Sequence, residues 1–155
     1  MKKIFIILFL LLVSTIPTYF YSGVECEPTE TKSTEPTWED GWKDFIPALI
    51  QVESEGNPRA LGKNNDRGIL QITPILVKEV NRISGLTYTH DDAWDPEKSI
   101  EMFYIIARKY CPEQDFEKMA RIWNGGPQGH TKECTIAYWN KVKNELDVLN
   151  SIKDI

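Results

Sequence analysis

The chain has 155 residues, of which 41% are hydrophobic, 26% charged and 11% aromatic, and this composition is typical of one globular domain. Its 23 acidic side chains outnumber the 18 basic ones and give a formal charge of −5, so nucleic acid is not expected as a partner. Nine Gly, nine Pro and a mean hydropathy of −0.37 also exclude a collagen, a coiled coil and a protein with several membrane spans.

The first 23 residues have the pattern of an export signal. Lysines at positions 2 and 3 precede an unbroken apolar run over residues 4–13, and Pro17 follows soon after. The run is shorter than the roughly 20 residues of a membrane span, although residues 14–21 would extend it to a marginal one. Residues 1–23 are therefore expected to be a signal peptide or an N-terminal membrane anchor. The protein is expected in the periplasm, in the cell envelope or outside the cell.

Residues 24–41 (VECEPTETKSTEPTWEDG) are rich in Glu, Thr and Pro and contain almost no aliphatic side chains. Such a segment cannot bury enough apolar surface to offset the entropy that is lost on folding. We therefore expect an acidic tether. From residue 42 to about residue 150 apolar residues recur with regular spacing and without an internal repeat, which predicts that this part is the folded domain.

Proline and capping residues mark the starts of five predicted helices. Pro suits the first helical turn because its φ is already helical and its missing N–H would have no partner there. Asp and Thr side chains accept hydrogen bonds from the first backbone N–H groups. The helices are expected to begin after Asp44, at Pro74, at Pro96, after Asp115 and at about Lys132. They are expected to end near Ser54, Gly85, Pro112, Gly125 and Leu149.

Apolar side chains recur at the helical spacing of three and four residues in these segments. The inward positions expected from this spacing include Leu76, Val80, Ile83, Ile100, Phe103, Tyr104, Ala107, Met119, Ile122, Trp123, Tyr138, Val142, Leu146 and Leu149. Only residues 60–71 (ALGKNNDRGILQ), which are polar before a short apolar run, are suited to a β element. The predicted fold class is α+β and mainly α, with about five helices and at most a small β element.

The chain contains three cysteines, Cys26, Cys111 and Cys134. An exported protein can form disulfides, and one of three cysteines must stay unpaired in a monomer. We expect the bond between Cys111 and Cys134, which both lie in the predicted domain. Closing a loop of this length would add about 3 kcal/mol to stability in the chain-entropy model. Three free thiols are the alternative.

Glu53 lies in the apolar stripe of the first predicted helix. Residues three, four and seven positions before it, Ile50, Leu49 and Ile46, share its helix face. Burial disfavours the charged form of a carboxyl group and raises its pKa, which suits an acid that donates a proton near neutral pH. The alternative is a glutamate that turns into solvent where the helix ends, at residues 56–58.

Several short motifs accompany Glu53 along the chain. They are Glu53-Ser54, Asn57-Pro58 with Ala60, and Gly68-Ile69-Leu70-Gln71-Ile72-Thr73-Pro74. Together they resemble the "ES…NP.A…G..Q..P" signature of the lytic transglycosylases, in the soluble-type (SLT) family with a core like that of goose lysozyme. Further matches are Asp95-Pro96 with Ile100, which resembles a "DP…I" helix start, Trp123-Asn124-Gly125-Gly126, which resembles "YNxG", and Tyr138 with Val142 in the final helix. The resemblance covers residues 45–142 and implies a lysozyme-like fold.

That resemblance implies cleavage of the β-1,4 bond between N-acetylmuramic acid and N-acetylglucosamine in peptidoglycan. Glu53 would protonate the glycosidic oxygen and then, as a carboxylate, accept the proton of the muramoyl 6-hydroxyl. That hydroxyl attacks C1 and leaves a 1,6-anhydro product, with the substrate's own acetamido group supporting the charge. Neither a second enzymic carboxylate nor a cofactor is implied, unlike in the glycosidases that use two carboxylates.

Four further residues match family positions that line the cleft or orient the acid, namely Ser54, Gln71, Asn124 and Tyr138, and Trp123 stands at a fifth such position with a different side chain. Each has a simpler interpretation. A helix end suits Ser54 and Asn124, a turn or short strand suits Gln71, and a core position suits Tyr138. Trp123 replaces the usual Tyr of "YNxG", which keeps a donor and a flat face but loses the acceptor of the phenol.

Asp66 would permit a different mechanism. It lies two residues before Gly68, in a stretch that also resembles the second-carboxylate region of the chicken-type lysozymes, which are the standard example of two-carboxylate catalysis. If Asp66 faced Glu53 across the cleft, water would complete the reaction and the protein would be a muramidase. Residues 64–66 are equally typical of a solvated turn, and we favour the turn.

Other site chemistries find no support in the sequence. His90 and His130 lie in different predicted loops without the spacing of metal ligands, so no metal or other cofactor is expected. The expected partner is the glycan strand of peptidoglycan. The small domain suggests a local opener of the wall for an envelope machine, or a phage-type lysin. A third alternative is an inactive module that binds peptidoglycan without cleaving it.

Overall fold

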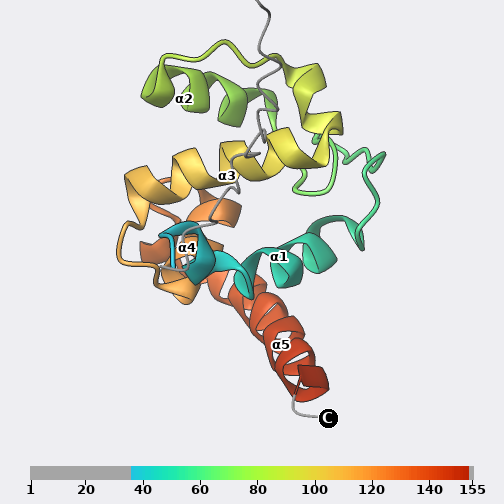
Figure 1. Cartoon of the computed structure of the whole chain (residues 1–155), viewed down its shortest axis with the longest axis vertical. Coiled ribbons are helices and arrows are strands. Elements are labelled where there is room, and N and C mark those ends of the chain that lie inside the picture. The colour runs from blue at the N-terminus through green and yellow to red at the C-terminus, as the bar shows by residue number, and fades with distance from the viewer. Residues whose placement is uncertain (1–35, 154–155) are drawn as a thin grey trace, which may run out of the picture. The chain divides into compact units, whose positions relative to one another are not determined.

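The computed structural model describes residues 36–153, and they form a helical domain (Figure 1). The predictions for the export signal, for the tether up to residue 35 and for Cys26 lie outside the described residues. The α-helices are α1 (Phe45–Ser54), α2 (Pro74–Ser84), α3 (Pro96–Tyr110), α4 (Phe116–Gly125) and α5 (Ile136–Lys153). Short 3-10 helices are η1 (Glu39–Trp42), η2 (His90–Trp94), η3 (Gly129–Thr131) and η4 (Glu133–Thr135). The prediction of a mainly α, lysozyme-like domain is confirmed.

The predicted caps account for three of the helix starts. The Thr73 hydroxyl accepts a hydrogen bond from the backbone N–H of Leu76 at 3.0 Å, and the carboxylates of Asp95 and Asp115 cap α3 and α4 in the same way. Helix α1 also begins directly after Asp44, as predicted, but the Asp44 side chain makes no capping bond. Its carboxylate instead accepts a hydrogen bond from Lys153 at 2.6 Å and so joins the start of α1 to the end of α5.

The last helix begins at Ile136, four residues after the predicted start. The segment before it packs directly on α4, where a Cβ added to Gly129 would lie 1.9 Å from the carbonyl oxygen of Arg121. The buried Thr135 hydroxyl accepts a hydrogen bond from Arg121 at 3.1 Å and lies 2.8 Å from the carbonyl oxygen of Gly129. Because these contacts fold the segment into η3 and η4, a regular helix cannot begin earlier.

At the other end, residues 38–41 pack on the domain although their composition assigns them to the tether. The indole N–H of Trp38 donates a hydrogen bond to the carbonyl of Pro112 at 3.1 Å. The guanidinium of Arg108 lies 4.5 Å from the centre of the Trp38 ring, within cation–π range. The Trp38 side chain thus fixes this stretch to the end of α3, and the average composition of residues 24–41 does not predict this contact.

A group of aromatic rings forms the centre of the core. Trp42, Phe45 and Phe103 are fully buried, and Trp42 and Phe45 both pack against Phe116, with Phe45 and Phe116 5.0 Å apart. These rings join η1, α1, α3 and α4. Helix α3 also contacts α2, while α5 contacts α1 and α4, so α3 lies between the two groups of helices (Figure 1).

The predicted β element is reduced to two isolated bridges within the described part of the chain, Leu61 with Arg67 and Arg67 with Ile72. Residues 60–72 form a loop that folds back on itself. Gly68 fixes its position: it has φ +73°, and a Cβ there would lie 1.9 Å from the carbonyl oxygen of Ala93. Only glycine permits both the left-handed conformation and this close approach.

The expected disulfide is not present, and this prediction is corrected: Cys111 and Cys134 are both free. The Cys111 thiol is buried at the end of α3 and points to the carbonyl oxygen of Asp115 at 3.3 Å, whereas Cys134 is exposed on η4. Burial raises the pKa of the Cys111 thiol to about 11, so this side chain behaves as a small apolar group.

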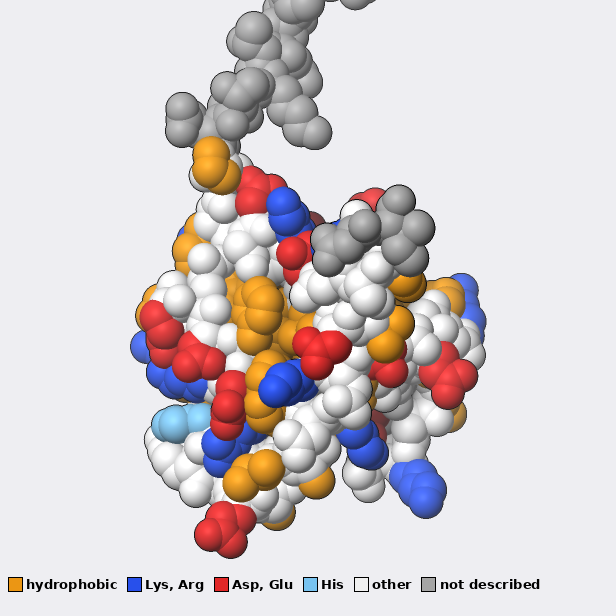
Figure 2. Space-filling model, turned by 90° about the horizontal axis from the view of Figure 1, so that it is seen from below, with side chains coloured by type: hydrophobic (Ala, Val, Ile, Leu, Met, Phe, Trp, Pro, Cys, Tyr) orange, Lys and Arg blue, Asp and Glu red, His pale blue; other side chains and the backbone are white. Residues whose placement is uncertain are grey.

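The helices of residues 36–153 are not membrane-spanning in pattern, and the side chains on one face form a surface of mixed charge (Figure 2). None of these helices combines the length and the hydropathy needed to cross a membrane. Figure 2 shows one face of the molecule, where acidic and basic side chains are interspersed around a central group of hydrophobic ones. A face of this kind does not attract a charged polymer through one sign of charge.

Gly68→Ala is expected to destabilise the domain more than a matched change elsewhere. A Cβ on a residue with φ near +73° lowers the free energy of unfolding by about 1–2 kcal/mol. At Gly68, overpacking against Ala93 lowers it by roughly 1–3 kcal/mol more. Gly85 is the control, because it has φ +74° and no atom within 4 Å of an added Cβ. Urea unfolding measures the free energy of unfolding of each variant, and equal losses in the two variants would show that the contact with Ala93 does not constrain Gly68.

Candidate active site

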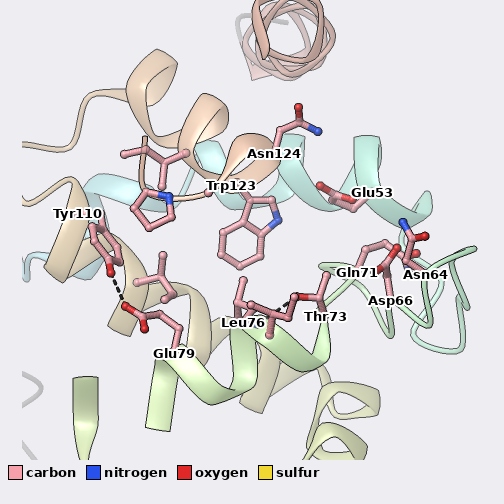
Figure 3. A pocket seen from close by; sticks show the side chains of 15 residues that line it. Glu53, Asn64, Asp66, Gln71, Thr73, Leu76, Glu79, Tyr110, Trp123 and Asn124 are labelled. Atoms are coloured by element: carbon pink, nitrogen blue, oxygen red, sulfur yellow. Dashed lines mark hydrogen bonds between the residues drawn. The ribbon is translucent and has the colours of Figure 1, made fainter. Parts of the chain in front are cut away.

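A cavity of about 700 Å³ lies among α1, α2, α3, α4 and the loop of residues 60–73. This volume is typical of ligand sites, which span about 300–1,000 Å³. Figure 3 shows Glu53, Asp66 and Gln71 together at one end, with Trp123 in the middle. The lining residues are Glu53, Asn64, Asp66, Gln71, Thr73, Ile75, Leu76, Glu79, Ile106, Tyr110, Ile122, Trp123, Asn124, Gly126 and Pro127.

Glu53 projects from the last turn of α1 into this cavity and does not turn out into solvent. Its pKa is raised to about 7: burial is the main cause, a hydrogen bond from Tyr138 works in the opposite direction, and the negative charge of Asp66 adds a smaller upward contribution. The Tyr138 hydroxyl donates that bond to Oε1 of Glu53. Near neutral pH the group therefore exists in both protonation states, which is the requirement for an acid that later serves as a base.

Tyr138 lies on α5 and reaches Glu53 because α5 packs against α1. Burial raises the pKa of the Tyr138 phenol, and the nearby Glu53 charge raises it further, so the phenol stays protonated and acts as a donor. It does not line the cavity. Its place behind the carboxyl group makes Tyr138 a positioning residue for Glu53.

Ser54 also lies behind the site. Its hydroxyl is 2.8 Å from the carbonyl oxygen of Ile69 and 3.3 Å from that of Ile50. The shorter contact joins the end of α1 to the loop of residues 60–72. Ser54 is therefore placed to hold the two walls of the cavity together, and it is not among the lining residues.

Gln71 lines the cavity from a strained backbone position, with φ +48°. Its side-chain NH2 group donates to the carbonyl oxygens of Gly68 at 3.0 Å and Ala60 at 3.2 Å. These bonds do not use the side-chain oxygen of Gln71. A Cβ on Gly62 would lie 2.6 Å from that oxygen and 2.7 Å from Oδ2 of Asp66. The glycine thus leaves the space that these two polar side chains occupy.

Asp66 lines the cavity and is partly buried, while Asn64 and Asn65 before it are exposed and belong to a turn, so the turn and a carboxylate that faces Glu53's cavity occur together. Its Oδ1 atom is buried and has no hydrogen-bond partner among residues 36–153. The loop turns back because the N–H of Gly62 donates to the backbone carbonyl of Asp66 at 2.8 Å, and this directs the carboxylate inward. The structure therefore brings a second carboxylate into the cavity that holds Glu53.

Trp123 and Asn124 enter the cavity from the last turn of α4. The Trp123 ring packs against Phe103 with ring centres 5.5 Å apart, and Figure 3 shows it in the middle of the cavity with Asn124 on the side of Glu53. Helix α4 ends at Gly125, where Gly126 takes φ +79°. Both interpretations of Asn124 are therefore compatible, because one residue lines the cavity and ends a helix.

The residues at the opposite end of the cavity were not predicted from the sequence. There Glu79 on α2 accepts hydrogen bonds from Tyr110 on α3 and from Arg82. The bond from Arg82 and then that from Tyr110 lower the pKa of Glu79 to about 2. The sequence does indicate Glu79 as a candidate, because this residue lies three positions after Leu76 and four before Ile83, in the apolar stripe of its helix.

Histidines play no part in the lining of this cavity. Nε2 of His90 lies 2.8 Å from the carbonyl oxygen of Ile72 and supports the loop from outside. Among residues 36–153, no group of three or more His, Cys, Asp or Glu side chains is arranged to hold a metal ion. The cavity therefore contains the carboxyl group of Glu53, a second carboxylate from Asp66 and the aromatic ring of Trp123.

Comparison with known proteins agrees with this geometry. Residues 35–145 match the family model described as "Transglycosylase SLT domain". A protein called "Lysozyme" from Ostrea edulis is 56% identical over 32 residues, which are 21% of this chain and only 23% of that lysozyme. The family match covers most of the chain and all of the residues that line the cavity. The chain therefore belongs to the family of SLT transglycosylase domains.

Proposed function

We propose that this protein cleaves the β-1,4 bond between N-acetylmuramic acid and N-acetylglucosamine in the glycan strands of peptidoglycan. The observation that carries the proposal is the carboxyl group of Glu53, which lines a ligand-sized cavity and has a pKa raised to about 7 by burial. Membership of the SLT family supports a substrate in peptidoglycan. The substrate lies in the cell envelope, in keeping with the export that residues 1–23 predict.

The first step uses Glu53 as an acid. Its proton passes to the glycosidic oxygen while the bond from that oxygen to C1 of the muramic acid breaks. Positive charge then develops on the sugar ring, and Glu53 becomes a carboxylate. The hydrogen bond from Tyr138 stabilises that carboxylate, because a hydrogen bond to the charged form favours it. Tyr138 thereby sets how readily Glu53 gives up its proton and how readily it takes one back.

For the second step we propose hydrolysis, because Asp66 supplies a second carboxylate in the same cavity. Its negative charge stabilises the cationic sugar, as in glycosidases with two carboxylates. Water adds its hydroxyl group to C1, and the proton it releases returns to a carboxylate of the pair. The stretch that is 56% identical to an oyster lysozyme also supports this outcome, although it spans less than a quarter of that protein.

Transglycosylation is the second candidate, and the family match supports it. In that reaction the muramoyl 6-hydroxyl attacks C1, and Glu53 takes the proton of this hydroxyl. No second carboxylate is required, so Asp66 would act only by raising the pKa of Glu53. The two candidates differ in their products: hydrolysis gives a reducing end, and transglycosylation gives a 1,6-anhydro end that contains one water fewer.

Mass spectrometry of muropeptides is the test. We expect the wild-type protein to produce reducing ends, and Glu53→Gln to lower kcat by about 10²–10⁴-fold because the proton donor is lost. Asp66→Asn is expected to lower kcat by roughly 10²-fold or more, because charge stabilisation at the sugar is lost. Anhydro ends from both the wild type and Asp66→Asn would contradict hydrolysis and favour transglycosylation. Binding without turnover in the wild type would indicate an inactive module.

The pH dependence of cleavage tests the role of Tyr138. Activity is expected to fall as the pH rises through about 7, because Glu53 then loses the proton it must donate. Tyr138→Phe removes a hydrogen bond that lowers the pKa of Glu53, so the alkaline limb of kcat/KM should move to higher pH.

The matched control is Tyr88→Phe. The Tyr88 hydroxyl donates to Glu101 at 2.7 Å and lies outside the cavity, so its removal should leave the limb in place. A limb that does not move in Tyr138→Phe, or that moves equally in both variants, would show that Tyr138 does not set the protonation of Glu53.

A further inference from the structure

The cavity has a second polar end formed by Glu79 and Tyr110. In Figure 3 these two side chains lie on the opposite side of Trp123 from Glu53 and Asp66. Both residues line the same cavity as the two acidic groups of the proposed reaction. The first step of cleavage therefore leaves this end unused.

Glu79 retains the capacity to accept one more hydrogen bond. Its Oε1 accepts from the Tyr110 hydroxyl and from Nη2 of Arg82, and its Oε2 accepts from Nε of Arg82 at 2.8 Å. A carboxylate has about four acceptor positions on its two oxygens. These three bonds therefore leave a position open on Oε2, and the side chain is 26% exposed.

The charge at this end favours a neutral ligand over a cation. Hydrogen bonds lower the pKa of Glu79 to about 2, so it is ionised at any pH near neutrality. Its charge is already offset by the paired Arg82 and by the more distant Lys109. An ammonium group would therefore meet little net attraction, whereas a hydroxyl group would find a charged acceptor, which makes the stronger kind of hydrogen bond.

The stretch of cavity between the two polar ends is apolar. Figure 3 shows Leu76 and the flat Trp123 ring between Glu79 and Glu53, and the lining of the cavity also includes Ile106, Ile122 and Pro127. Sugar rings match such a surface, because their C–H faces are apolar and their hydroxyl groups project from the rim. A ligand that spans the cavity thus needs polar groups at its two ends and apolar faces between them.

We propose that Glu79 and Tyr110 form a distal sugar subsite that binds a hydroxyl group of a glycan residue away from the cleaved bond. This inference rests on the proposed function. Hydrogen bonds from Tyr110 and Arg82 hold the Glu79 carboxylate in place. The subsite accounts for a cavity that extends well beyond the reacting groups, and it favours longer glycan strands over short ones.

The test compares cleavage of peptide-free glycan oligomers of increasing length, from tetrasaccharide to octasaccharide. The measured quantity is the ratio of kcat/KM for the long oligomer to that for the short one. Glu79→Ala removes a charged acceptor, and the ratio is expected to fall about tenfold, mainly through KM. Tyr110→Phe frees the carboxylate and should lower the ratio in the same direction, which keeps the test valid if Glu79→Ala does not fold.

The chain offers a matched control in the pair of Tyr88 and Glu101, which makes the same kind of hydrogen bond outside the cavity. Glu101→Ala and Tyr88→Phe should keep the wild-type ratio. An unchanged ratio in Glu79→Ala and Tyr110→Phe would overturn the inference alone. A length effect seen only with peptide-bearing strands would assign this end to the peptide and overturn the sugar assignment. A wild-type protein that cleaves no oligomer would overturn the proposed function, and this inference with it.

Discussion

Burial of one carboxyl group, that of Glu53, is the interaction on which the site depends. Its desolvation opposes ionisation, and the hydrogen bond from Tyr138 limits how far the pKa rises. Both conditions need tertiary structure, because Tyr138 belongs to α5 and is 85 residues away along the chain. The packing of α5 against α1 therefore does more than fill the core, since it adjusts the proton affinity of the group that would cleave the substrate.

The loop of residues 60–72 supplies the other wall of the site, and glycines determine its path. Gly68 allows the loop to touch the carbonyl oxygen of Ala93, and Gly62 leaves space for Asp66 and Gln71. The Ser54 hydroxyl then joins the loop to the end of α1, directly after Glu53 in the chain. The strained backbone at Gln71 fits this account, because strain is retained where the surrounding contacts over-determine a conformation.

Local chemistry is enough to predict most of the helices. Pro after Thr73 or Asp95 makes a helix start visible in the sequence, and the structure contains both caps. Asp44 is an aspartate before a helix, like Asp95, but its carboxylate pairs with Lys153. The pattern of neighbouring residues does not reveal this long-range pair. The start of α5 was missed for the same reason, since the contacts of Thr135 with the segment before it override an otherwise helical pattern.

The site was predictable where a residue interrupts a pattern on its own helix. Glu53 was found in this way, and Glu79 could have been found by the same argument. For Asp66 the sequence offered both a place in the cleft and a turn, and it could not decide between them, because the direction of this side chain depends on how a loop closes on itself and on the missing side chain of Gly62. The pairing of Cys111 with Cys134 failed because chain separation alone does not show that one thiol is buried and the other exposed.

The most direct test of this account is an NMR titration of the Glu53 side-chain carboxyl carbon in the free protein, assigned by comparison with Glu53→Gln. The account predicts a pKa of about 7 in the wild type and a lower value in Asp66→Asn, where the neighbouring charge is removed. A wild-type value near 4.5, the ordinary value for glutamate, would contradict it, because Glu53 would then be fully ionised near neutral pH and unable to donate a proton.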